Sequence, residues 1–155
     1  LRALGEAWPV TLVERPGAAS VLENAGGLVV RAADEPAGLQ RLRTWVKDRA
    51  RTRLTPVVRA LAEELELPFH RCTWRLQRTR WGSCSPRGTL SLNAALAFLP
   101  PRLADQVFVH ELCHLRVPDH SPAFWRLVEA HRPGGRALER LLSRAGRWVP
   151  GWLRG

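Results

Sequence analysis

The residues with the clearest chemistry are the His-Glu-Leu-Cys-His segment at positions 110–114 and the later His120. Histidines four residues apart point the same way on an α-helix, because four residues turn the chain through about 400°. The imidazoles of His110 and His114 can therefore bind one metal ion. Glu111 lies about 100° round the helix, where it can act on a water molecule without binding the metal. Three nitrogen ligands with one open position are typical of catalytic zinc, so we expect Zn²⁺ as the cofactor.

A helix must hold these side chains, and the sequence predicts one over residues 101–116. Pro100 and Pro101 can begin it, because proline suits the first turn of a helix. Apolar residues then recur at helical spacing, at Leu103, Val107, Phe108, Leu112 and Leu115. The alternative is a core helix without metal, but histidines and a glutamate are costly to bury without a purpose.

The third histidine depends on a turn. Pro118 must end the helix, so residues 117–119 have to bring His120 back to the other two imidazoles. Asp119 would either supply an oxygen ligand or cap the next helix, and its position favours the cap. A Ser-Pro pair begins that helix, which we expect over residues 121–131.

The composition limits the classes of protein that this chain can belong to. The 155 residues suit one domain, and no 18-residue apolar run suggests a membrane span. Three cysteines without paired spacing favour a reducing compartment, so we expect a cytoplasmic protein, and a monomer. The chain has no methionine, which suggests that its true N-terminus is missing. It also has no tyrosine, so an oxyanion donor would have to be another group.

Further elements follow from the spacing of apolar residues. Strands are predicted at residues 28–31, 72–77 and 89–93, and helices at residues 39–65 and 136–146. We expect the second and third strands to pair as an antiparallel ribbon. Pro56 should bend or split the long helix. Residues 1–20 give no clear signal.

Basic residues crowd the first half of the long helix. They are Arg41, Arg43, Lys47, Arg49, Arg51 and Arg53, in a chain with a net charge of +10. The simple interpretation is a solvated face, and the sharper one is a stripe that binds nucleic-acid phosphates. Charge alone supports only non-specific association, and an arginine-rich composition can arise without selection for a polyanion.

Four motifs together resemble the YgjP-like family. They are RWGSCS at 80–85, LSLN at 90–93, VHELCH at 109–114 and HSPAFW at 120–125. The members are regarded as metal-dependent hydrolases related to the WLM and SprT-like zinc peptidases. The resemblance implies an α+β fold with a zincin-like minimal metallopeptidase core, in which a small antiparallel sheet packs with a long N-terminal helix, the HExxH helix and C-terminal helices. It also implies metal binding by His110, His114 and His120.

The resemblance covers roughly residues 28–150, which we take as the metallopeptidase domain. Residues 1–27 would be an N-terminal segment, the remainder of a longer β-region that members usually carry. Residues 151–155 would form a tail.

Substrate contacts are expected from a strand. In related zincins an edge strand holds the substrate by strand addition, which needs free backbone groups on one side. We expect the strand at 89–93 to take this part, with Leu90, Ser91, Leu92 and Asn93 as its substrate-binding residues. Arg80 and Trp81 would line the same cleft, although Trp81 is equally suited to be a core anchor.

These expectations lead to one preferred function and two alternatives. The preferred function is a zinc metallopeptidase in which Glu111 takes a proton from the activated water and delivers it to the leaving amine of a polypeptide. The first alternative is a nucleic-acid-associated, SprT-like protease that docks through the helix at 39–65. The second is a metal-binding interaction module without turnover, in which Glu111 would have no use.

Overall fold

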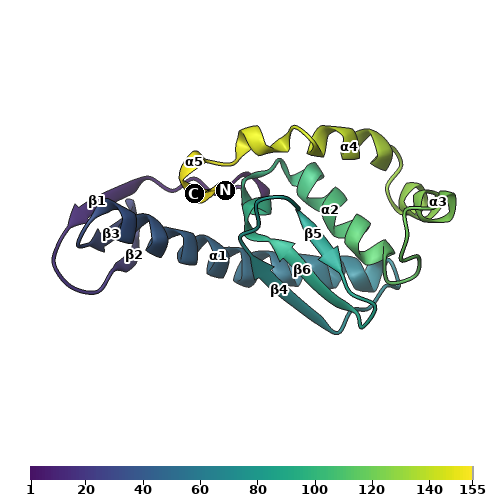
Figure 1. Ribbon diagram of the computed structural model, residues 1–155, viewed down its shortest axis with the longest axis horizontal. Coiled ribbons are helices and arrows are strands. Elements are labelled where there is room, and N and C mark those ends of the chain that lie inside the picture. Colours follow the sequence, from purple (N-terminus) through teal and green to yellow (C-terminus); the bar gives the residue numbers. More distant parts are fainter. Residues whose placement is uncertain (155) are drawn as a thin grey trace.

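The computed structural model describes residues 1–154 and has the predicted α+β architecture, with two small mixed sheets and a set of helices (Figure 1). The strands are β1 (Val10–Glu14), β2 (Ser20–Asn24), β3 (Gly27–Ala32), β4 (Arg71–Arg75), β5 (Gly82–Cys84) and β6 (Thr89–Asn93). The α-helices are α1 (Glu35–Glu64), α2 (Pro101–Cys113), α3 (Pro122–His131), α4 (Gly135–Leu142) and α5 (Gly151–Arg154). Short 3-10 helices are η1 (Arg2–Leu4), η2 (Ala94–Phe98) and η3 (Ala145–Trp148). None of the helices described here has the length and apolarity needed to cross a bilayer.

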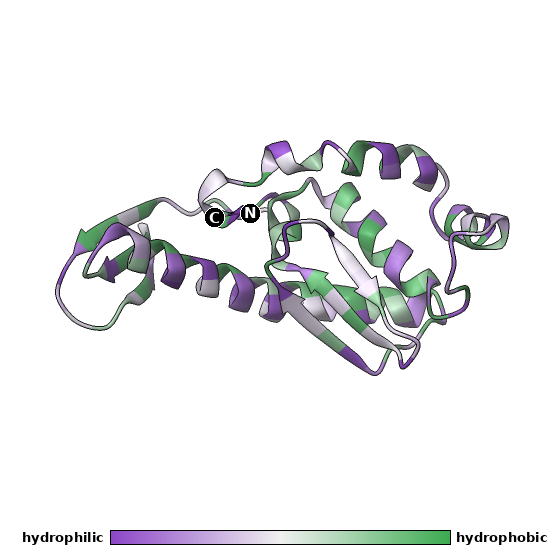
Figure 2. Ribbon diagram, in the orientation of Figure 1, coloured by the Kyte–Doolittle hydropathy of each residue, from purple (hydrophilic) through white to green (hydrophobic). Residues whose placement is uncertain are grey.

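α1 is the long helix that the sequence predicts, and it begins earlier because Asp34 caps it. The Asp34 carboxylate accepts a hydrogen bond of 2.8 Å from the Ala37 amide, which satisfies a free N–H of the first turn. Pro56 does not split the helix, since Leu54 and Val58 on either side are buried in the core. Hydrophobic and hydrophilic colours alternate along α1, as expected for a helix with one apolar stripe (Figure 2).

The first sheet has the strand order β1-β3-β2. β1 runs parallel to β3, and β2 runs antiparallel to it. β3 buries Leu28, Val30 and Ala32, whereas β1 is exposed along its whole length. Sequence analysis found β3 but neither of its partners, because each partner exposes most of its side chains and so lacks a buried apolar pattern.

The second sheet has the order β4-β6-β5, and it corrects the predicted antiparallel ribbon. β4 runs parallel to β6, with Cys72 opposite Leu90, and β5 pairs antiparallel with the other side of β6. The chain leaves β4, forms β5 at the far side of the sheet, and returns through a tight connection into β6. β6 therefore lies in the middle of the sheet and is not an edge strand.

The helix predicted over 101–116 is α2, which packs against β5 and is itself contacted by α3 and α4. It ends at Cys113, and α4 ends at Leu142, both a few residues before the predicted ends. α5 lies in the predicted tail, whose last residue, Gly155, falls outside the described residues.

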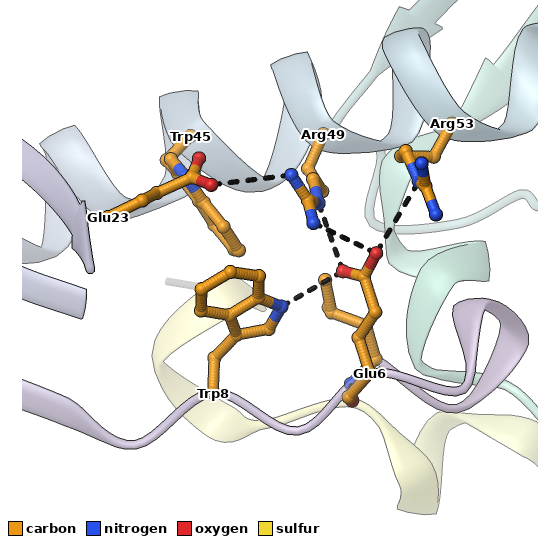
Figure 3. Close-up of polar contacts among 7 residues, drawn as sticks. Glu6, Trp8, Glu23, Trp45, Arg49 and Arg53 are labelled. Carbon is orange, nitrogen blue, oxygen red and sulfur yellow. Dashed lines mark hydrogen bonds and ion pairs between the residues drawn. The ribbon is translucent and has the colours of Figure 1, made fainter. Parts of the chain in front are cut away.

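Ion pairs join the N-terminal residues to α1 (Figure 3). The Arg49 guanidinium donates to the Glu6 carboxylate at 2.9 Å and lies 3.4 Å from Glu23, while Arg53 lies 3.5 Å from Glu6. The Trp8 indole N–H also donates to Glu6, at 2.9 Å. Arg51 of the predicted stripe also pairs with Asp48, at 3.7 Å. Three of the arginines therefore lie in ion pairs, so the basic residues of α1 do not form one continuous free stripe.

Candidate metal centre

The two histidines of the α2 motif lie side by side, as helical spacing requires. The ring centroids of His110 and His114 are 5.0 Å apart. His114 directly follows the last residue of α2 as its C-cap, and it keeps helical backbone angles (φ −65°, ψ −15°). The i, i+4 geometry is therefore preserved at the last turn of α2.

The loop after α2 brings the third histidine back to the first two. The Nε2 atoms of His110 and His120 are 2.9 Å apart, and donor nitrogens of all three imidazoles lie within 4.8 Å of one another. Asp119 accepts a hydrogen bond of 3.1 Å from the Ser121 amide at the start of α3. Asp119 therefore precedes the N-cap residue of α3, which is Ser121, and does not itself cap the helix as the sequence favoured. It is not part of the histidine cluster.

The imidazoles are also oriented as metal ligands usually are. The Nδ1 atom of His114 lies 3.1 Å from the carbonyl oxygen of Val117. A carbonyl only accepts, so Nδ1 must carry the proton, and the Nε2 lone pair of His114 is free. The Nδ1 atom of His110 lies 3.4 Å from a carboxylate oxygen of Glu139 on α4. The carbonyl partner holds the ring of His114 and increases its basicity as a ligand. The Glu139 carboxylate lies near His110 without a hydrogen bond to its Nδ1 atom. Three imidazoles with a free ring nitrogen directed at one point are a donor set that fits a divalent metal.

One phenyl ring supports all three imidazoles. Phe124 on α3 is fully buried, and its ring stacks on His114 with centroids 4.4 Å apart and planes 22° apart. It also meets the rings of His110 and His120 edge-on, each at 4.9 Å. Sequence analysis included Phe124 only as part of the HSPAFW motif at 120–125. No feature of the sequence indicated that it would pack against the whole cluster.

Glu111 is a buried carboxylate beside the cluster, with 6% of its surface exposed. Burial raises its pKa to about 7, with His110 and Arg80 opposing this rise and Glu139 adding to it. A β-carbon built on Gly82 of β5 would lie 2.6 Å from a Glu111 carboxylate oxygen and 2.7 Å from its Cγ. Glycine at this position leaves the space that the glutamate side chain occupies.

The comparisons agree with this geometry. A family model described as the YgjP-like metallopeptidase domain matches residues 1–145. The chain belongs to the YgjP-like family. It is a metal-dependent peptidase, and its family implies a divalent metal and a polypeptide substrate.

A solved structure shares the fold of this YgjP-like domain. It is the crystal structure of the metallopeptidase zymogen of Pyrococcus abyssi abylysin, at 23% identity and a TM-score of 0.51. The match covers 59% of this chain and 93% of that one. It confirms the zincin-like fold. The comparison with curated proteins gave no match.

The prediction that the strand at 89–93 is an edge strand of the YgjP-like domain and binds substrate is wrong. Leu90 and Leu92 are fully buried, and β6 is hydrogen-bonded on both sides, so its residues cannot pair with a peptide. The Asn93 side chain instead donates to the carbonyl oxygens of Gln77 and Arg80, at 2.8 and 2.9 Å. Asn93 therefore fixes the connection before β5. Ser91 is half-buried.

β5 is the edge strand that lies beside the cluster. Sequence analysis missed it because Gly-Ser-Cys has no β-branched or aromatic residue. Arg80 is exposed, and Trp81 is half-buried, with its indole N–H 3.3 Å from the Leu142 carbonyl oxygen. Trp81 packs against the core, as the anchor interpretation expected, and it also borders a large cavity.

Proposed function

We propose that this chain is a zinc peptidase in which His110, His114 and His120 bind the ion and Glu111 is the general base. The supporting observation is that three imidazole donors converge next to one buried carboxylate. Imidazole ligands favour zinc over magnesium or calcium, which prefer oxygen ligands. Zinc held by three neutral imidazoles supplies a Lewis acid that lowers the pKa of a water molecule and polarises a carbonyl oxygen.

The protein's own residues would carry the proton and place the substrate. Glu111 takes a proton from the water that attacks the scissile carbonyl carbon, and it gives this proton to the nitrogen as the C–N bond breaks. Its buried position beside the imidazole cluster places the carboxylate where it can both take and return this proton. The free edge of β5 would hold the peptide backbone in an extended conformation. Gly82 keeps that edge close to Glu111.

The test compares metal content with peptide cleavage. We expect about one zinc ion per chain, and cleavage of unfolded protein that stops with a chelator and returns with zinc. Glu111→Gln should retain the metal and lose about 10²- to 10⁴-fold in kcat/KM, the range for removal of a general base. Glu63→Gln is the matched control, because Glu63 is an exposed residue of α1.

Two results would reject the proposal. A chain that binds no zinc at stoichiometric level has no metal centre. A chain that binds zinc but cleaves unfolded protein no faster than Glu111→Gln is a metal-binding module without turnover.

A further inference from the structure

A large cavity lies beside the metal centre. Its volume is about 1050 Å³, and it is bordered by α1, by the connection between β4 and β5, and by the C-terminal helices α4 and α5. Pockets for small ligands run up to roughly 1,000 Å³, so a peptide segment has room here. Nothing in the proposed reaction uses most of this space.

The cavity carries a strong positive charge. Its basic residues are Arg43, Lys47, Arg75, Arg78, Arg80 and Arg154, and its one carboxylate is Glu139. None of the six forms an ion pair with a carboxylate of residues 1–154. On α1, by contrast, Arg49 faces another side and is paired with Glu6. A concave surface with one sign of charge concentrates ligands of the opposite sign.

The wall that carries two of these arginines is held in place. Arg78 and Arg80 belong to the connection that Asn93, 3% exposed, binds through Gln77 and Arg80. Trp81 at the end of this connection bonds to the Leu142 carbonyl oxygen. The charges are therefore presented by a fixed surface and not by a free loop.

The cavity opens directly onto the proposed peptide-binding edge. Arg80 and Trp81 border it and are followed at once by Gly82, the first residue of β5. Glu139 also borders it and lies 3.4 Å from a ring nitrogen of His110. A peptide that pairs with β5 and continues past Gly82 would come next to Arg80 and Trp81, which border this space. This continuity favours a polypeptide occupant over a nucleic acid.

We propose that this cleft, which we call the basic cleft, binds carboxylates of the polypeptide substrate a few residues from the scissile bond. An extended chain advances about 3.3 Å per residue, so the acidic residues that reach the arginines would lie beyond the residues at the scissile bond itself. The inference rests on the proposed peptidase function and adds the substrate class: polypeptides that are acidic on one side of the cleaved bond.

The first experiment measures binding and does not depend on turnover. Fluorescent peptides that differ only in flanking Glu, Gln or Lys residues are titrated into zinc-loaded Glu111→Gln protein. The Glu peptide should bind about tenfold more tightly than the Gln peptide, and the preference should shrink as NaCl rises from about 50 to about 500 mM. A free C-terminal carboxylate is tested against its amide, which separates terminal from side-chain carboxylates. Equal binding of the Glu, Gln and Lys peptides would overturn the inference.

Matched variants test whether the basic cleft is responsible for the preference for the Glu peptide. Arg75→Gln/Arg78→Gln removes two of the six basic residues, so the ratio of Glu-peptide to Gln-peptide affinity should fall. In Arg71→Gln/Arg87→Gln, which removes the same charge from exposed residues outside the cleft, the ratio should persist. Arg78→Glu should shift the preference toward the Lys peptide. If both double variants lose the preference equally, net charge and not the basic cleft is responsible.

Two further outcomes keep this inference separate from the peptidase proposal. If wild-type protein cleaves Glu, Gln and Lys peptides with the same kcat/KM, the peptidase stands and the acidic preference fails. If peptides bind with the expected preference but nothing is cleaved, the peptidase proposal fails alone.

If single-stranded DNA displaces the Glu peptide and binds more tightly through Arg75 and Arg78, the occupant is a nucleic acid and the inference is overturned.

Discussion

The two sheets of this chain have the same topology but different surroundings. In each, the first strand lies parallel to the third, the second lies antiparallel to the third, and the third is central. In the first sheet the edge strand β1 is exposed throughout. In the second, the edge strand β5 is half-covered and lies against α2, where Gly82 touches Glu111.

The difference shows that the topology alone does not make a site. Both sheets offer an edge strand with free backbone groups, and the first even exposes the apolar residues Val10 and Leu12 there. Only β5 has a buried carboxylate and an imidazole cluster beside it. The helix that covers a strand, rather than its place in the sheet, gives the strand its chemical role.

The largest effect should come from the core of the second sheet. Leu92 on β6 is fully buried, so Leu92→Ala should lower the free energy of unfolding by about 2–5 kcal/mol. Leu22 on β2 of the first sheet is 46% exposed, and Leu22→Ala should cost under about 1 kcal/mol. Urea denaturation measures both. Similar losses would mean that the two sheets contribute equally to the core.

The second test uses one glycine from each sheet. Gly82→Ala places a β-carbon against Glu111, so we expect kcat/KM to fall about 100-fold, the effect of misplacing a catalytic group by roughly 1 Å. Zinc content and thermal stability should change little. Gly27→Ala should instead lower the thermal stability and leave kcat/KM unchanged. Gly27 has a φ of +128°, which disfavours alanine, and a β-carbon there would meet the Pro9 carbonyl oxygen. Normal activity in Gly82→Ala would show that Glu111 does not need this space.

Sequence spacing was sufficient where one helix sets the geometry. His110 and His114 meet because the helical repeat forces them together, and the bounds of β6 match the predicted strand. His120 follows a short turn that contains Pro118, and the structure brings it into the cluster as the sequence analysis expected. These features depend on residues close together in the chain, so local patterns could predict them.

What the sequence could not predict depends on distant packing. The direction of β4 relative to β6 is decided by where the chain places β5, and three residues without strand propensity do not show this. Glu139 reaches His110 only because α4 packs on α2. The basic cleft combines residues from both ends of the chain. Arg43 and Lys47 were noted as part of a helical stripe, but their neighbours in the fold were not predictable.

The third test concerns α4, the helix that brings Glu139 to the metal centre beside the second sheet. Glu139→Gln keeps the shape of the side chain and removes the charge beside the Nδ1 atom of His110. We expect zinc affinity to fall about 10- to 100-fold, the usual effect of losing such a partner. Competition with a chelator measures this without any activity assay. Glu63→Gln, at an exposed residue of α1 outside the cluster, should leave the affinity unchanged. If Glu139→Gln leaves the zinc affinity unchanged, Glu139 does not support His110 as a metal ligand and only borders the basic cleft.

The smallest effect should come from Glu6, which joins the segment before β1 to α1. Glu6→Gln removes the charge that Arg49 binds, so we expect a loss of about 1 kcal/mol in stability with kcat/KM unchanged. Glu14→Gln on exposed β1 is the control, since Glu14 makes no ion pair within residues 1–154. A drop in kcat/KM would mean that the first sheet, despite its distance in sequence from the site, supports the chemistry after all.

The pH dependence of this last variant tests the same ion pair independently. Burial raises the pKa of Glu6, but hydrogen bonds from Arg49 and Trp8 outweigh burial, so the folded pKa lies below the ordinary 4.5. A carboxylate of this kind stabilises the fold above its unfolded pKa, and this stability is lost as the pH falls through the folded value. Wild-type protein should therefore lose more stability than Glu6→Gln between about pH 6 and pH 3. Parallel losses would show that the ion pair contributes nothing to folding, because removing a charge that interacts only in the folded state must change the slope.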